Sequence, residues 1–62
     1  MLNLKLARIK KGYTQKFIAE QLNVSLNTVS RWEKGERTMT VDKLIQLAEI
    51  LDTTTDYLLG RE

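Results

Sequence analysis

The chain has 62 residues, which at ordinary domain sizes is enough for one domain, so residues 1–62 are expected to fold as a single unit. It contains no cysteine and no histidine, which excludes disulfides, thiolate and imidazole metal ligands, cysteine nucleophiles and histidine acid–base chemistry. No cluster of acidic residues suggests a carboxylate metal site, and no run of about 18 apolar residues suggests a membrane span. We therefore expect no metal, no cofactor and no membrane partner.

Charge is distributed unevenly along the chain. Residues 1–37 hold eight basic and three acidic side chains, a net charge of +5, whereas residues 38–62 hold two basic and five acidic ones, a net charge of −3. Such a molecule can present a basic face to a polyanion and turn its acidic part away. In this interpretation the face formed by residues 15–34 is basic. The alternative is a charged surface that only contacts solvent.

Glycines and small polar residues divide the chain into five short helices. Gly12 and Gly35 each follow lysines, and this pattern is typical of a helix C-terminus. Residues suited to N-capping precede the four later helices, namely Thr14, Ser25, Thr40 and Thr54. No segment alternates like a strand, so the sequence predicts an all-α, compact bundle. The expected helices span residues 2–11, 15–22, 26–34, 41–51 and 55–59.

The first helix has two competing apolar stripes. One consists of Leu2, Leu6 and Ile9, and the other consists of Leu4 and Ala7. Both recur at helical spacing, so periodicity alone does not decide which of them is buried.

Residues 15–32 carry the pattern of a helix-turn-helix. Ala19 is small enough for a second helix to cross close above it, and Asn23 tolerates the backbone conformation of a sharp turn. Apolar residues that would fill the angle between the two helices are Ile18, Leu22, Val24, Val29 and Trp32. Two short helices joined by a short turn also occur in plain helical bundles, so this pattern alone leaves both alternatives open.

Longer motifs extend the similarity over nearly the whole chain. They include Lys11-Gly12-Tyr13-Thr14-Gln15, Leu22-Asn23-Val24-Ser25, Thr28-Val29-Ser30-Arg31-Trp32-Glu33-Lys34-Gly35 and Asp56-Tyr57-Leu58-Leu59-Gly60. With these motifs the sequence resembles the Cro/CI-type, XRE-like helix-turn-helix family of phage and bacterial repressors. The resemblance implies a lambda-repressor-like DNA-binding domain whose helix-turn-helix is formed by the second and third helices. It also implies that Leu4 and Ala7 form the buried stripe.

Three residues depart from the family pattern. Asn23 stands where the family usually has glycine, and Met39 stands where it usually has proline. Phe17 occupies a position that is usually polar. We expect it to cover Tyr13, and the alternative is that Phe17 is an interaction site of its own.

The third helix is the expected reader of DNA bases. With Val29 and Trp32 pointing inward, a rotation of about 100° per residue places the opposite side at Leu26, Asn27, Ser30 and Arg31. Asparagine can pair with adenine, arginine with guanine, and leucine can contact a thymine methyl group. The resemblance implies base contacts from Ser25, Leu26, Asn27 and Arg31. The alternative is a solvated helix face.

Other residues are expected to hold the DNA backbone or the fold. The resemblance assigns a phosphate contact to Gln15, at the start of the second helix, where free N–H groups favour an anion. Thr28, Lys34 and Arg37 lie beside or after the third helix and would reach the flanking phosphates. The family pattern also pairs Arg8 with Glu33 as a structural ion pair, and the alternative is two solvated charges.

These features together imply a transcriptional regulator, in the first place a repressor, and not an enzyme. Its expected partner is a palindromic double-stranded DNA operator, bound by a homodimer that is weak in solution, because one helix contacts only a few base pairs. Its expected location is the cytoplasm, in a bacterial or phage-encoded setting. The alternative function is a protein-interaction module, such as an antitoxin-like or scaffold bundle.

Overall fold

A computed structural model describes residues 3–61, which form five helices and contain no strand. They are α1 (Leu4–Lys11), α2 (Gln15–Leu22), α3 (Leu26–Lys34), α4 (Val41–Ile50) and α5 (Thr55–Leu59). The prediction of an all-α bundle is confirmed.

Two of these helices are shorter than expected. α1 begins at Leu4 because Asn3 lies in a turn, where its side-chain amide donates to the carbonyl of Tyr57 at 2.6 Å. The earlier start at Leu2 lies outside the described residues. α4 ends at Ile50, and the chain then turns through Asp52, whose φ of 53° is incompatible with a continuing right-handed helix.

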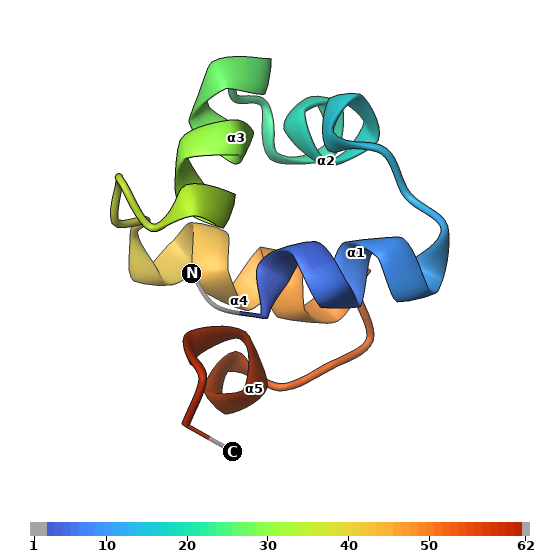
Figure 1. Ribbon diagram of the computed structural model, residues 1–62, viewed down its shortest axis with the longest axis vertical. Helices are drawn as coiled ribbons and strands as arrows, with labels where there is room; N and C mark the ends of the chain where they lie inside the picture. The colour runs from blue at the N-terminus through green and yellow to red at the C-terminus, as the bar shows by residue number, and fades with distance from the viewer. Residues whose placement is uncertain (1–2, 62) are drawn as a thin grey trace.

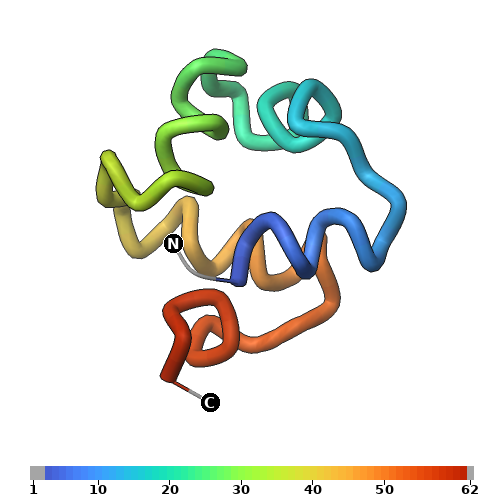
Figure 2. The backbone as a smooth tube through the Cα atoms, viewed as in Figure 1, coloured from blue at the N-terminus to red at the C-terminus, as the bar shows by residue number. Residues whose placement is uncertain are grey.

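The five helices are arranged with α2 and α3 at one end of the longest dimension and α5 at the other (Figure 1). α1 and α4 cross the middle of the molecule, as the tube through the Cα atoms also shows (Figure 2). α2 packs against α3 and α4, α1 packs against α3 and α5, and α4 packs against α5. The helix-turn-helix is therefore supported from below by α1 and α4.

Side-chain caps explain where the later helices begin. Each N-cap hydroxyl accepts a hydrogen bond from the backbone N–H three residues further on, which satisfies a donor that the helix itself cannot pair. The donor-to-acceptor distances lie between 3.0 and 3.4 Å. The four capping residues are those expected from the sequence, namely Thr14, Ser25, Thr40 and Thr54.

The turn between α2 and α3 depends on Asn23. This residue has a φ of 56° and a ψ of 46°, the left-handed conformation that asparagine tolerates better than most other residues with a side chain. The prediction that Asn23 accepts the turn in place of glycine is confirmed.

All five helices contribute to one core. Its buried apolar residues are Leu4, Ala7, Ile18, Ala19, Leu22, Val29, Trp32, Leu47, Ala48, Leu51 and Leu58. On α1 the stripe of Leu4 and Ala7 is the buried one, whereas Leu6 and Ile9 are 59% and 55% exposed. The choice that the family resemblance made between the two stripes is therefore correct.

Candidate nucleic-acid interface

α3 has one buried and one exposed side. Val29 and Trp32 lie in the core, while Leu26 is 52% exposed and both Asn27 and Arg31 are exposed. Within residues 3–61, neither the Asn27 nor the Arg31 side chain forms a hydrogen bond. The structure thus brings these three candidate base readers together on one exposed surface, where the polar groups of Asn27 and Arg31 are available to a ligand.

Ser25 differs from the other candidate base readers because its hydroxyl is engaged locally. Its oxygen accepts the N–H of Thr28 at 3.1 Å and lies 2.8 Å from the Thr28 hydroxyl. The two hydroxyls hold each other at the start of α3 while both remain at the surface. Capping is therefore the role of Ser25 in the free protein, and its base contact stays a prediction.

The candidate phosphate contacts fall into three places. Thr28 and Arg37 both line a hollow of about 270 Å³ between the start of α3 and the segment that leads into α4. Lys34 is exposed at the last position of α3, outside that hollow, and Gln15 lies at the start of α2. Contacts at three separate places would fix the orientation of a bound duplex.

Lys43 is a residue that the sequence analysis missed. Its ammonium nitrogen lies 2.6 Å from the carbonyl oxygen of Leu22, and its side chain also lines the hollow beside Thr28 and Arg37. A cation at this place satisfies a carbonyl at the negative end of α2. Lys43 therefore joins α4 to α2, and nothing in its local sequence indicates that contact.

Arg8 and Glu33 form an ion pair between α1 and α3. The Arg8 Nε donates to Glu33 Oε2 at 2.7 Å, and Nη2 donates to Oε1 at 3.3 Å. The side chains are only 12% and 5% exposed. Arg8 Nη1 also donates to the carbonyl of Tyr13 at 2.9 Å, so the pair holds the segment that enters α2.

The side chain of Gln15 joins this ion pair. Its Nε2 donates to Glu33 Oε1 at 2.9 Å, a contact between α2 and α3 that the sequence analysis did not foresee. A glutamine amide has two N–H donors, so one remains for a phosphate. The phosphate contact of Gln15 stays a prediction.

Phe17 covers Tyr13 at the start of α2. Their ring centroids are 4.5 Å apart with planes inclined by 34°, and both side chains are half-buried. This contact agrees with the first of the two roles expected for Phe17.

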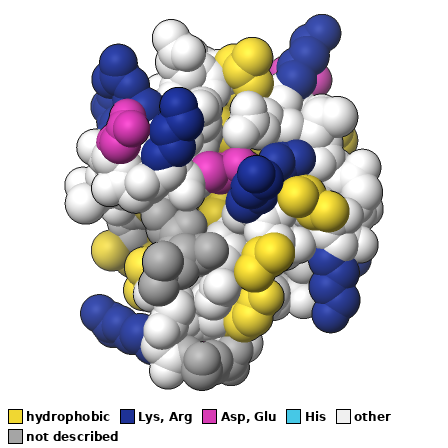
Figure 3. Space-filling model, viewed as in Figure 1, with side chains coloured by type: hydrophobic (Ala, Val, Ile, Leu, Met, Phe, Trp, Pro, Cys, Tyr) yellow, Lys and Arg dark blue, Asp and Glu magenta, His cyan; other side chains and the backbone are white. Residues whose placement is uncertain are grey.

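The basic charge expected on the face of α2 and α3 is small. Residues 15–40 hold four basic and three acidic side chains, a net charge of +1. The basic excess comes from α1, which contains Lys5, Arg8, Lys10 and Lys11 and no acidic residue. Figure 3 accordingly shows Lys and Arg side chains spread around one face of the molecule instead of gathered over a single element. Most of the +5 charge of residues 1–37 therefore lies on α1 and not on the helix-turn-helix.

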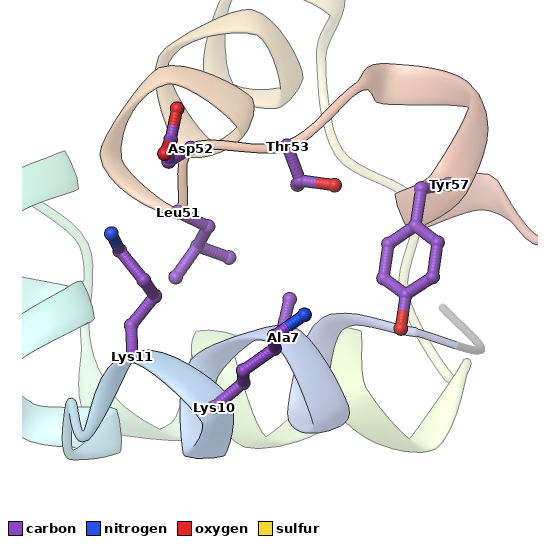
Figure 4. A pocket seen from close by; sticks show the side chains of 7 residues that line it. All are labelled: Ala7, Lys10, Lys11, Leu51, Asp52, Thr53 and Tyr57. Carbon is purple, nitrogen blue, oxygen red and sulfur yellow. The ribbon is translucent and has the colours of Figure 1, made fainter.

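A second hollow, of about 440 Å³, lies away from α2 and α3, between α1, the turn after α4, and α5 (Figure 4). Ala7 and Leu51 line it together with Lys10, Lys11 and Asp52. Within residues 3–61 there is no group of three or more acidic, cysteine or histidine residues that could hold a metal. The same part of the chain contains no helix long and apolar enough to cross a membrane.

This combination of five helices, a left-handed turn at Asn23 and an exposed α3 defines a helix-turn-helix domain. A helix-turn-helix family model matches residues 4–58, and the chain belongs to this Cro/CI-type, XRE-like family. The comparison with solved structures gave no significant match.

Relatives of the chain are named as regulators of transcription. This chain is 46% identical over 59 residues to the HTH-type transcriptional regulator ImmR of Bacillus subtilis. It is 33% identical over 48 residues to the transcriptional repressor RstR of Vibrio cholerae, and 36% identical over 55 residues to the transcriptional activator BcrR of Enterococcus faecalis. The matches cover 95%, 77% and 89% of this chain but only 46%, 43% and 27% of these relatives, so the chain spans less than half their length. The family and these names agree with the expectation that the chain is not an enzyme.

Proposed function

We propose that this chain is the sequence-specific DNA-binding part of a transcription regulator that acts in the bacterial cytoplasm, where operator DNA lies. The observation that carries the proposal is the exposed side of α3, on which Leu26, Asn27 and Arg31 stand over a buried Val29 and Trp32. A helix of this kind fits the major groove, where base edges differ in their donors and acceptors. Ser25, at the start of α3, is the fourth proposed base contact.

Repression is the proposed direction of regulation. It is supported by the Cro/CI-type family and by RstR, which is named a repressor, although BcrR is named an activator. A reporter gene placed behind a bound site, in cells with and without the protein, tests the direction. We expect lower expression when the protein is present, and higher expression would reverse this part of the proposal.

DNA binding itself is tested by a salt titration against a mixture of duplexes. Gln15, Thr28, Lys34 and Arg37 are the proposed phosphate contacts, and each phosphate neutralised by Lys34 or Arg37 steepens the dependence of affinity on salt. Because two of these contacts are cationic in each copy, we expect a slope of log affinity against log salt of about −2 for one bound copy and about −4 for two. An affinity that does not change with salt, or no binding at all, would favour a protein-interaction module.

Asn27→Ala and Arg31→Ala should each relax base preference at one position of the site. The lost contact is worth about 1–3 kcal/mol of discrimination, and neither side chain supports the fold, since both are exposed. Selection of sites from a random DNA pool measures the preference. Lys34→Ala is the control, because a phosphate contact should weaken binding equally at all sequences. Unchanged preferences in both α3 variants would show that α3 is not the reading helix.

Binding should involve two copies on a palindromic site, with little dimer in free solution. Leu58 is buried in the core, which leaves only Leu59 and part of Tyr57 on α5 as apolar area for a contact between copies. Half-sites about one helical turn apart would bring two copies together on DNA. Sedimentation with and without a palindromic duplex tests this. A tight dimer without DNA, or one copy on a full palindrome, would contradict it.

A further inference from the structure

We propose that Glu33 and Arg8 are positioning residues for DNA binding: Glu33 holds the side-chain amide of Gln15 ready for a phosphate, and Arg8 holds Glu33. The inference rests on the proposed function, since the ligand is a phosphate of the DNA backbone. It assigns to the ion pair a role in binding in addition to its role in the fold.

The orientation of Gln15 is set by Glu33. The carboxylate accepts three hydrogen bonds, one at Oε2 from Arg8 and two at Oε1, from Arg8 and from Gln15 Nε2. A carboxylate only accepts hydrogen bonds, so it must face the nitrogen of the Gln15 amide and not its oxygen. With one N–H on Glu33, the amide has a second N–H for a ligand.

The backbone that enters α2 is held by the same residues. Arg8 donates to the carbonyl of Tyr13, and the next residue, Thr14, caps Phe17 N–H. The first N–H groups of a helix have no partner within it, and the helix dipole favours an anion at this end. An amide already fixed beside these groups spares the entropy cost of ordering a glutamine side chain when phosphate binds.

Arg8 also makes this arrangement compatible with a phosphate, because it neutralises the charge of Glu33. Glu33 alone would place a buried negative charge one hydrogen bond away from Gln15, and this charge would repel an anion. Arg8 Nε, at 2.7 Å from Glu33 Oε2, balances that charge. The pair therefore provides the oriented acceptor that Gln15 needs without a net negative charge.

A double-mutant cycle in DNA affinity tests the role. Gln15→Ala should weaken binding about tenfold in the otherwise unchanged protein, as expected for a hydrogen bond to a charged group. In the background Arg8→Met with Glu33→Met, which leaves neither charge unpaired, the same change should weaken binding less than about threefold. Each variant is measured at a temperature at which circular dichroism shows it folded.

Lys34→Ala is the matched control. Lys34 is a proposed phosphate contact and follows Glu33 in the chain. Within the described residues its side chain forms no hydrogen bond or ion pair with Glu33 or Gln15. Its effect should be the same in both backgrounds. Suppose that Lys34→Ala weakens DNA binding, and that Gln15→Ala lowers DNA affinity equally in both backgrounds or in neither. The positioning role is then overturned, while DNA binding stands. If the unchanged protein does not bind DNA, the proposed function itself fails.

A measurement without DNA tests separately whether Glu33 holds the side-chain amide of Gln15. In the NMR spectrum of the free protein, the two proton shifts of the Gln15 side-chain amide should differ from those of a solvent-exposed glutamine, because one N–H is bonded to Glu33. In the Arg8→Met, Glu33→Met background these shifts should move to those of a solvent-exposed glutamine. Identical Gln15 signals in both proteins would overturn the proposal, because they would show that Glu33 does not hold the amide.

Discussion

Replacing Trp32 with alanine should unfold much of the protein at moderate temperature. Trp32 lies on α3 and is 3% exposed, in the core shared by all five helices. Truncation of a buried tryptophan to alanine typically costs about 3–5 kcal/mol. A small domain has a total stability at the low end of about 5–15 kcal/mol, so this single change removes a large part of it.

Thermal melts followed by circular dichroism measure the effect. For a domain of this size each kcal/mol lowers the Tm by about 4–8 °C, so the Tm of Trp32→Ala should fall by tens of degrees. Leu26→Ala is the control on the same helix, since Leu26 is 52% exposed and its loss should change stability by about 0.5 kcal/mol or less. A Trp32→Ala melt equal to that of the unchanged protein would contradict the burial of Trp32.

The elements that the sequence predicts well are those set by local chemistry. Thr14 and Ser25 begin helices because their hydroxyls pair N–H groups three residues away, and Asn23 turns the chain through its own backbone conformation. The division of α3 into a core side and an exposed side also follows from the spacing of Val29 and Trp32. These contacts involve residues close together in the chain.

Periodicity was insufficient where two stripes were equally apolar. Leu6 and Ile9 are as hydrophobic as Leu4, yet α3 and α5 pack against the other side of α1. The family resemblance supplied this choice, because the motif carries information on tertiary packing that a single helix lacks.

The contacts that the sequence did not predict join distant residues through long side chains. Gln15 reaches Glu33 across 18 positions, and Lys43 reaches the Leu22 carbonyl across 21. Each depends on the relative placement of two helices and on one rotamer of a flexible side chain. Both contacts lie at the ends of α2, and they fix α2 to α3 and to α4.

Removing one partner of the Arg8–Glu33 ion pair should lower the free energy of unfolding strongly, whereas replacing both partners should lower it much less. Arg8→Met leaves the Glu33 carboxylate, only 5% exposed, without its counter-charge. Removing one partner of a buried pair typically costs about 3–5 kcal/mol, whereas replacing both by apolar residues of similar size is often neutral. Arg8→Met with Glu33→Met also loses two hydrogen bonds, one to the Tyr13 carbonyl and one from Gln15 to Glu33, each worth about 0.5–1.5 kcal/mol.

We therefore expect the double variant to lie within about 3 kcal/mol of the unchanged protein, and Arg8→Met alone to be clearly less stable than the double variant. Urea unfolding at one salt concentration measures the free energy of unfolding of the unchanged protein, Arg8→Met and the double variant. Lys5→Met, an exposed position on α1, is the control. If the double variant is as unstable as Arg8→Met alone, the cost comes from lost packing and hydrogen bonds and not from an unpaired charge. If Arg8→Met is as stable as the unchanged protein, Glu33 is sufficiently hydrated without Arg8, and the pair does not hold α1 to α3.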